Sequence, residues 1–278
     1  MLVVDHHNWI RRGRFALLKD GKTFYVKTGQ GFPLVLLHLF GGRSWWFSKV
    51  ADKLSEDFTV YAVDIIGFGY SDTPRRDYTV EDLAAWITEF LDYHEIAKTH
   101  LVGTHGSSMA SVNFATTYPE RLEKLILDGP IPWTSDEGKK LYQERFRHHW
   151  LDQNERPKPV MEWEGNHFPG LPEPERTESR QRLADDWDPH ANWWLMGLHN
   201  ILEFCDRKNL HLIKAPTLLL YGEQDMLRGT ESWMPGGERR MQEGINGSEL
   251  VVIPGCGSFP AYEKPTEYTE AVRSFLLR

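Results

Sequence analysis

The stretch KTHLVGTHGSSMASVNFATTYPERLEKLILDGP, residues 98 to 130, decides the fold. It begins with a short apolar run that ends at Gly103 and predicts a strand. Apolar residues then recur at helical spacing between Gly106 and Pro119, and a second apolar run, Leu125 to Leu127, predicts another strand. Two buried strands joined by a helix form a parallel crossover unit, whose ligand crevice lies outside the carboxyl ends of the strands. We therefore expect the turn at residues 103 to 107 to carry the functional site.

Composition excludes several classes of partner. The chain has 278 residues, a net charge of -8 and a pI near 5.8, which argues against nucleic acid or an anionic membrane and favours a small-molecule substrate. Its two cysteines, Cys205 and Cys256, are interpreted as small buried hydrophobes rather than a disulfide framework. No secretory leader pattern opens the chain, and the longest apolar run, Phe32 to Phe40, is far too short to span a membrane. We expect a cytoplasmic monomer or homodimer.

The turn at residues 103 to 107 resembles that of the α/β-hydrolase fold superfamily, in particular its cap-bearing branch of epoxide hydrolases, haloalkane dehalogenases and C-C hydrolases. The family's elbow is G-x-nucleophile-x-G on a strained turn from strand to helix. Here the elbow reads GTHGS, which places His105 at the nucleophile position. Ser107 or Ser108 would be the nucleophile in a shifted register. The flanking LVG and YPERLEKLIL match the family without a gap and favour His105.

The last loop of the chain carries the opposite change. Residues 251 to 265, VVIPGCGSFPAYEKP, resemble the family's last strand and its catalytic histidine loop, with Ser258 at the histidine position. Histidine and serine are therefore exchanged between the two turns. GEQD places Asp225 at the family's acid position, and Asp128 is the alternative acid because some members carry theirs after the preceding strand.

A third motif, HLFGG, resembles the family's oxyanion loop. By position the oxyanion donors are the backbone N–H groups of Phe40 and Gly106. Leu39 replaces the usual first glycine of the loop, and His38 is expected to be a structural support. In the following DIIGFGYSD turn, Asp64 and Asp72 are expected to accept hydrogen bonds from nearby backbone.

The remaining pattern completes an α/β fold, with a mostly parallel central sheet flanked by helices and an inserted helical cap. We expect core residues 1 to 130 and 210 to 278, with the cap at 131 to 209. The predicted elements are a hairpin over 14 to 27, strands at 33 to 38, 58 to 63, 215 to 221 and 249 to 253, and helices at 79 to 93 and 265 to 277.

Tryptophan is concentrated around the predicted cap, which favours a closed cavity for an apolar or aromatic substrate. The candidate substrate-binding residues are Trp45, Trp46, Trp133, Trp193 and Trp194. The alternative is that these rings only pack the cap on the core. We predict no cofactor and no metal site, since the twelve histidines include no HExxH spacing.

An exchanged pair changes the expected chemistry. His105 would face the substrate, with the Ser258 hydroxyl behind it and Asp225 behind Ser258, an order that suits general acid/base catalysis on a small carbonyl compound by a cofactor-free lyase, isomerase or cyclase. One alternative is hydrolysis of an ester, lactone or C-C bond, by water that His105 activates or by a Ser258/His105 dyad. The other is an inactive ligand-binding homologue. Leu39 and Ser107 favour this alternative, because both replace glycines of the family pattern.

Overall fold

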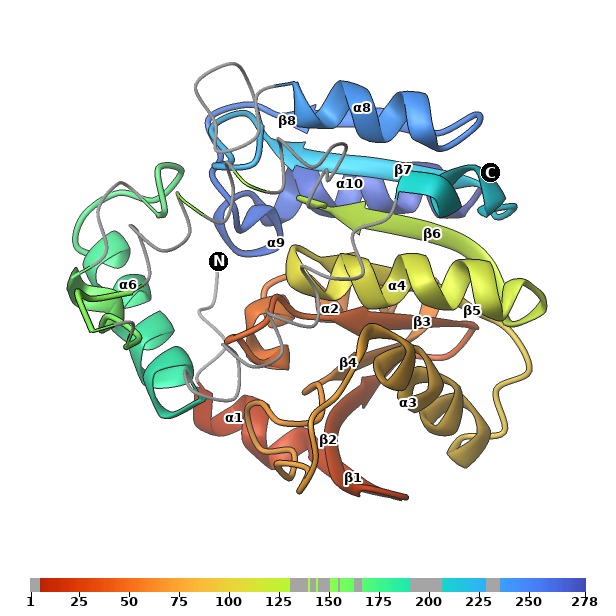
Figure 1. The fold of residues 1–278 in the computed structure, drawn as a ribbon, viewed down its shortest axis with the longest axis horizontal. Coiled ribbons are helices and arrows are strands. Elements are labelled where there is room, and N and C mark those ends of the chain that lie inside the picture. The colour runs from red at the N-terminus through yellow and green to blue at the C-terminus, as the bar shows by residue number, and fades with distance from the viewer. Residues whose placement is uncertain are drawn as a thin grey trace.

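The computed structural model describes residues 6–130, 151–154, 156–162, 167–190, 207–228 and 236–278, together with residues 140 and 144. One sheet of eight strands forms its centre, in the order β1-β2-β4-β3-β5-β6-β7-β8 (Figure 1). β1 and β2 pair antiparallel, β2 also pairs antiparallel with β4, and the strands from β4 to β8 are parallel. The strands are β1 Gly13–Leu18, β2 Gly21–Thr28, β3 Phe32–Leu37, β4 Phe58–Val63, β5 Thr99–Thr104, β6 Leu122–Asp128, β7 Thr217–Gly222 and β8 Glu249–Ile253.

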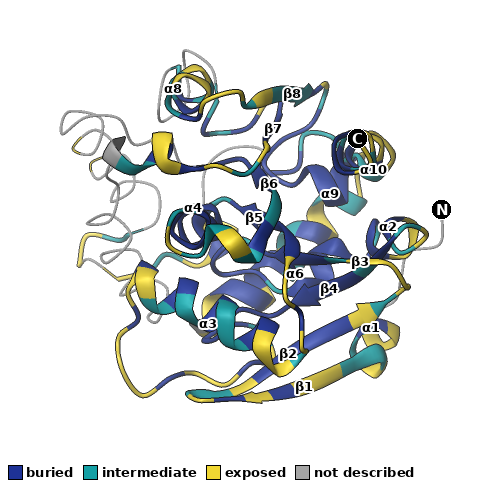
Figure 2. Ribbon diagram, turned by 90° about the vertical axis from the view of Figure 1, so that its right-hand side faces the viewer, coloured by how far each residue is buried: buried dark blue, intermediate teal, exposed yellow. Residues whose placement is uncertain are grey.

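Helices cover both faces of the sheet. α3, α4 and α8 lie on one face, and α1, α2, α9 and α10 lie on the other (Figure 2). Their bounds are α1 His6–Arg12, α2 Ala51–Leu54, α3 Val80–Tyr93, α4 Gly106–Thr117, α6 Glu175–Trp187, α8 Gly237–Gly244, α9 Pro260–Glu263 and α10 Pro265–Leu276. Short 3-10 helices are η1 Ser44–Phe47, η2 Pro119–Arg121, η3 Val160–Glu162, η4 Asp188–His190 and η5 Arg207–Leu212. This confirms the expected α/β-hydrolase fold.

The central strands are buried along their length because helices cover both faces. Every residue of β5 and β7 is buried, and the apolar runs that predicted these strands form the core of the sheet. The expected hairpin forms, with its turn at Lys19 and Asp20, one residue before the predicted Asp20-Gly21. Thr79 caps α3 through the expected capping box with Asp82. Two short helices, α1 and α8, were not predicted, because their apolar patterns are too short to indicate a helix.

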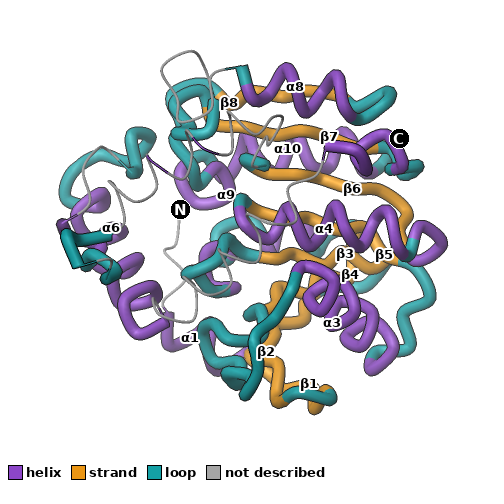
Figure 3. The backbone as a smooth tube through the Cα atoms, in the orientation of Figure 1, coloured by secondary structure: helices purple, strands orange, loops and turns teal. Residues whose placement is uncertain are grey.

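The described part of the segment between β6 and β7 lies beside the carboxyl ends of the strands. α6 stands apart from the sheet at that edge (Figure 3). It is tied to the core by Asp186, whose Oδ2 accepts a hydrogen bond from Trp46 Nε1 at 3.0 Å, and by Glu175, which contacts Lys49 Nζ at 2.7 Å. Within the described residues, no helix is long and apolar enough to cross a membrane.

Candidate active site

The elbow between β5 and α4 is a strained turn. His105 is the residue before α4 and has φ 47° and ψ -115°, a region that non-glycine residues rarely occupy. Its backbone N–H donates to the carbonyl of Asp128 at 2.8 Å, which fixes the turn to the end of β6. Strain of this kind persists where the surrounding structure holds it, and it marks the turn as a functional candidate.

The imidazole of His105 contacts Asp225 directly. His105 Nε2 lies 3.2 Å from Asp225 Oδ2, and the two side chains are 12% and 0% exposed. The other carboxylate oxygen of Asp225, Oδ1, accepts from the Leu227 N–H at 2.8 Å. Gly129 leaves the room for this pair, because a Cβ there would lie 2.5 Å from His105 Nε2 and 2.8 Å from Asp225 Oδ2.

This contact corrects the order expected for the three residues. The sequence predicted the Ser258 hydroxyl between His105 and Asp225, but the imidazole reaches the acid itself. His105 meets Ser258 through the backbone of Ser258, and the described residues show no hydrogen bond from the Ser258 hydroxyl to either partner. The imidazole of His105 is long enough to extend from the elbow to Asp225, so no group fits between them.

Electrostatics couple His105 to two carboxyl groups. Burial lowers the pKa of His105, but the charge and hydrogen bond of Asp225 outweigh it, with smaller contributions from Asp128 and the Ser258 backbone, so that the pKa is raised. Burial raises the pKa of Asp128 to about 8, against the opposing effect of His105. The hydrogen bond of the imidazole goes to Asp225, and Asp128 acts on it through charge alone among the described contacts.

The two residues expected to supply the oxyanion donors are in contact through the Phe40 ring. Gly106 is the first residue of α4, where the backbone N–H has no intrahelical acceptor. A Cβ on Gly106 would lie 2.5 Å from Phe40 Cδ2, so the Phe40 ring rests directly on this residue. Phe40 is buried and stacks on Phe68 at 5.6 Å. Their role as an oxyanion hole stays a prediction.

His38 supports the loop that leads to Phe40. Its Nε2 accepts from the Ile65 N–H at 3.0 Å, which leaves the proton on Nδ1 to be donated to the Leu39 carbonyl at 2.6 Å. Asp64 accepts from the Ser44 and Tyr70 N–H groups, as its turn motif predicted. These contacts are structural.

The serines after the elbow are buried parts of the turn. Ser107 Oγ accepts from the Thr104 N–H at 2.8 Å, and it lies within donating distance of the carbonyls of Thr104 and Leu37, at 3.0 and 3.1 Å. Ser108 is 1% exposed. A serine that closes the backbone of its own turn is poorly placed to attack a substrate, which favours the register with His105 at the elbow.

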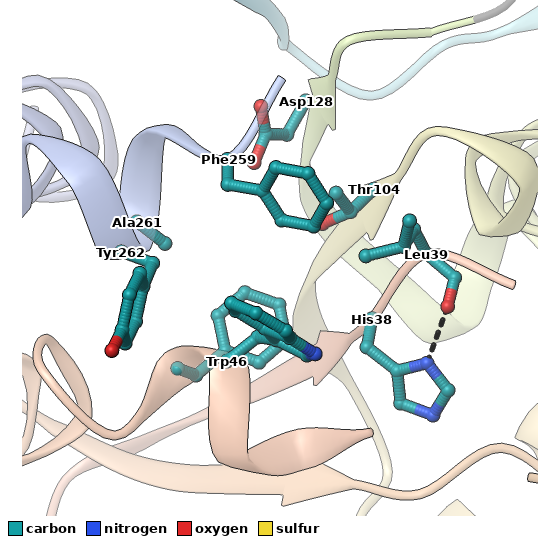
Figure 4. A pocket seen from close by; sticks show the side chains of 9 residues that line it. His38, Leu39, Trp46, Thr104, Asp128, Phe259, Ala261 and Tyr262 are labelled. Atoms are coloured by element: carbon teal, nitrogen blue, oxygen red, sulfur yellow. Dashed lines mark hydrogen bonds between the residues drawn. The ribbon is translucent and has the colours of Figure 1, made fainter. Parts of the chain in front are cut away.

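Of the predicted aromatic residues, Trp46 lines a pocket that the described residues form. The pocket is a small cavity of about 20 Å³ at the carboxyl ends of β3, β5 and β6 (Figure 4). It is lined by His38, Leu39, Trp46, Phe47, Thr104, Asp128, Phe259, Ala261 and Tyr262. Trp45 is buried against His6 and Tyr262 instead, in the packing role that was the alternative. Trp133, Trp193 and Trp194 lie outside the described residues.

Sequence reasoning missed two residues near Ser258. The Glu263 carboxylate accepts hydrogen bonds from the N–H groups of Gly257, Phe259 and Gly170, and so holds the loop on both sides of Ser258. Phe259 closes one side of the pocket. A buried glutamate one turn into a helix gives no signal that separates it from an exposed one. In the described ranges, no group of three or more His, Cys, Asp or Glu side chains could hold a metal ion.

Comparison with known proteins decides the family. The model of the alpha/beta hydrolase fold family matches residues 33–265. The chain belongs to the α/β-hydrolase fold family. It is 29% identical over 287 aligned residues to a 2-hydroxy-6-oxononadienedioate/2-hydroxy-6-oxononatrienedioate hydrolase of Escherichia coli, covering 95% of this chain and 96% of that protein.

Solved structures of α/β-hydrolases agree on the fold. A thermophilic esterase from Thermogutta terrifontis has a TM-score of 0.77 at 22% identity and covers 95% of this chain and 98% of its own. The enol-lactonase from Burkholderia xenovorans LB400 has a TM-score of 0.74 at 18% identity and covers 95% and 100%. In this α/β-hydrolase the imidazole rises from the elbow and meets Asp225, while the last loop presents serine.

Proposed function

We propose that the chain is a hydrolase that cleaves an ester, a lactone or a C-C bond beside a carbonyl in a small, largely apolar compound. In this proposal the His105–Asp225 pair activates water. The observation that carries it is the 3.2 Å contact between His105 Nε2 and Asp225 Oδ2 at the strained elbow, beside the N–H of Gly106. The names of the hydrolase, esterase and lactonase that it resembles favour hydrolysis over the lyase, isomerase or cyclase chemistry that the exchanged pair first suggested.

The roles follow from the ring atoms. Asp225 engages Nε2, so Nδ1 is the nitrogen that takes a proton from water as the water oxygen bonds to the carbonyl carbon. The negative charge that forms on the carbonyl oxygen would be stabilised by the N–H groups of Gly106 and Phe40. Collapse of this intermediate breaks the ester or C-C bond, and the imidazolium returns its proton to the leaving oxygen or carbon.

Activity should depend on pH in a defined direction. A general base must be unprotonated, and Asp225 raises the pKa of His105 above its ordinary value of 6.5. We therefore expect kcat/KM to rise with pH through this raised pKa, on an alkaline limb above that of an unpaired histidine. A rate that falls over this range would contradict the assignment of His105 as the base.

The test is turnover of a panel of aryl esters, lactones and a 2-hydroxy-6-oxodienoate, followed by ultraviolet absorbance. His105→Ala and Asp225→Asn should each lower kcat/KM by about a hundredfold or more. His211→Ala is the matched control, because His211 is an exposed histidine far along the chain. Full activity in folded His105→Ala would sink the proposal, and so would a wild-type protein that turns over no member of the panel.

A fluorophosphonate probe separates this mechanism from serine catalysis. Ser258 is held in no hydrogen bond with His105 or Asp225 through its hydroxyl, within the residues that the structure describes, so no activated serine should be labelled. Intact-mass analysis with an ordinary serine hydrolase as the positive control gives the readout. A label on Ser258, Ser107 or Ser108 would replace the water mechanism with acyl transfer.

A further inference from the structure

The last residue of α6 contacts the oxyanion loop, residues 38 to 42. Gly41 lies in a tight turn of this loop, where it has φ 83° and where the Gly42 N–H donates to the Leu39 carbonyl at 3.0 Å. A Cβ on Gly41 would collide with Cε3 of Trp187, at the end of α6. The Trp187 ring, which is 4% exposed, therefore rests directly on the backbone of the turn.

Asp186, the residue before Trp187, holds the segment that follows the turn at two points. Its Oδ1 forms an ion pair with Arg43 Nε, and its Oδ2 accepts a hydrogen bond from Trp46 Nε1 at 3.0 Å. From the core, Asp64 Oδ1 accepts from the Ser44 N–H at 2.6 Å, so two buried carboxylates hold this segment between them. The Arg43 and Asp186 side chains are 12% and 7% exposed, and removing either one would leave a buried charge without its partner.

The direction of the Phe40 N–H depends on how the turn around it is held. Among the described residues this N–H has no hydrogen-bond acceptor, so no bond of its own fixes it. The Phe40 ring packs on Gly106 and Phe68 of the core, but the two glycines that follow Phe40 give the backbone extra freedom, and it is α6 that covers them. A donor fixed in advance is the more effective one, because it needs no reorganisation as charge develops on a carbonyl oxygen.

We propose that Asp186 and Trp187 are positioning residues, which hold the Phe40 N–H in the direction that stabilises the oxyanion. The turn keeps this direction only while the end of α6 is docked on it. Part of the segment between β6 and β7 thereby contributes to the rate of the chemical step. The inference rests on the proposed function, because Phe40 serves as a donor only when a carbonyl is attacked.

Asp186 must be ionised to pair with Arg43, which sets the pH of the experiments. Burial raises the pKa of Asp186 to about 7, and the charges of Asp64 and Asp185 add to the increase. The charge of Arg43 and the hydrogen bond from Trp46 act in the opposite direction. Measurements at about pH 8 therefore compare each variant with a wild type in which the carboxylate is mainly ionised.

The first experiment observes the peptide group that carries the Phe40 N–H, in the full chain. Phe40 is the only phenylalanine in the sequence that follows a leucine. Leucine labelled with ¹³C at the carbonyl and phenylalanine labelled with ¹⁵N therefore give one carbon-detected correlation, which belongs to Leu39 and Phe40. We expect a single signal without relaxation dispersion in the wild type. In Asp186→Asn, which loses the charge that pairs with Arg43, the signal should split or show dispersion as the turn exchanges between positions.

Glu175→Gln is the matched control. Glu175 begins α6 and pairs with Lys49 Nζ at 2.7 Å, so this variant breaks another ion pair between α6 and the core, at the end of the helix away from the loop. Its signal should match that of the wild type. If folded Asp186→Asn also matches the wild type, or if Glu175→Gln shows the same exchange as Asp186→Asn, the proposal fails.

A second variant keeps the test decisive if Asp186→Asn does not fold. Trp187→Leu removes the ring that rests on Gly41 and leaves the ion pair of Asp186 in place. It should show the same exchange at the Leu39–Phe40 signal. A Trp187→Leu signal identical to that of the wild type would overturn the role of the ring.

Kinetics then test the consequence, with 4-nitrophenyl acetate or another ester of the panel that the wild type hydrolyses. Asp186→Asn should lower kcat about tenfold and leave KM within about twofold, because the donor is aimed at charge that exists only in the transition state. Glu175→Gln should keep both constants within about twofold. A higher KM at unchanged kcat would assign Asp186 to substrate binding and overturn its positioning role.

The inference and the proposed function fail in different ways. A wild type that hydrolyses no member of the panel contradicts the proposed function, yet the Leu39–Phe40 signal still shows whether Asp186 and Trp187 hold the loop. An active wild type whose Asp186→Asn variant keeps its kcat and a single signal without dispersion contradicts the inference alone.

Discussion

The turn that carries His105 and the loop that carries Ser258 are held in different ways. The elbow, residues 103 to 107, is closed by its own Ser107 Oγ, which accepts from the Thr104 N–H, and is fixed to β6 by the His105 N–H, which donates to the Asp128 carbonyl. The Ser258 loop, residues 254 to 259, is held by two carboxylates from outside it: Glu263 accepts from the Gly257 and Phe259 N–H groups, and Glu223 accepts from the Gly255 N–H. The elbow is strained and is held in part by its own Ser107 side chain, whereas the loop is held by carboxylates that lie outside it.

The difference explains why the imidazole and not the serine meets the acid. The rigid elbow fixes the direction in which the His105 side chain points. Gly129 has no side chain to block the imidazole, which therefore reaches Asp225. The Ser258 loop, anchored through the N–H groups on both sides of Ser258, offers the imidazole its backbone. The imidazole therefore contacts the acid from the elbow, and the exchange of histidine and serine between the two turns stays a prediction.

Removing the anchor of the loop should have the largest effect. Glu263→Ala leaves the N–H groups of Gly257, Phe259 and Gly170 without their acceptor in a buried setting. We expect the free energy of unfolding to fall by about 2–4 kcal/mol, because unpaired buried donors are costly. Urea denaturation followed by tryptophan fluorescence measures the change.

Two controls sharpen this first prediction. Glu270→Ala removes an exposed glutamate from the following helix and should change stability by less than about 0.5 kcal/mol. Glu263→Gln keeps one acceptor oxygen and should fall between the two. If Glu263→Ala is as stable as Glu270→Ala, the loop is held by something other than this carboxylate.

Most of the fold was readable from the sequence because its signals are local. Continuous apolar runs predict the buried parallel strands, to the residue for β4, Phe58–Val63, and to within two residues for β3 and β7. Asp20-Gly21 predicts the hairpin, whose turn lies one residue earlier. The helix α8 was missed because its eight residues, GERRMQEG, carry two glycines and little apolar character. The domain limits at 130 and 210 stay predictions, since much of that segment lies outside the described residues.

The next largest effect should be the change with pH of the contribution that His105 makes to the free energy of unfolding. The pKa of His105 is raised above 6.5, so its contribution to stability is fully present below pH 6.5 and is lost as pH rises through the raised value. Against His105→Asn, the wild type should gain ~1.4 kcal/mol of relative stability at low pH for each unit of that increase. Asparagine tolerates positive φ, which makes it the fair reference. Urea denaturation at several pH values provides the comparison, and a difference that grows with pH would contradict the direction.

Loss of the elbow's internal hydrogen bond should cost less. Ser107→Ala removes the acceptor of the Thr104 N–H, and we expect about 1 kcal/mol of destabilisation. Ser107→Gly, which matches the family's usual elbow, should cost more because glycine adds backbone entropy. An effect of Ser107→Ala as large as that of Glu263→Ala would erase the distinction between the two turns.

The candidate site was only partly readable, since its contacts join distant segments. Motif position brought His105, Asp225 and Ser258 to one place, but the order of contact depends on whether a ring from the elbow reaches the acid. The hydrogen bond between Trp46 and Asp186 joins residues that are 140 positions apart. Sequence spacing gives neither the direction of a side chain nor its partner in a distant segment.

The smallest effect should come from the serine itself. Ser258→Ala removes a hydroxyl that bonds neither His105 nor Asp225 in the described structure, and it keeps the backbone that the imidazole meets. We expect stability within about 0.5 kcal/mol of the wild type and kcat/KM within about threefold. Ser258→Pro is the contrast, because it restricts the backbone that Glu263 anchors on both sides. If Ser258→Ala lowered kcat/KM as much as His105→Ala does, Ser258 would be the nucleophile. The contact between His105 and Asp225 would then activate a serine on the loop instead of water.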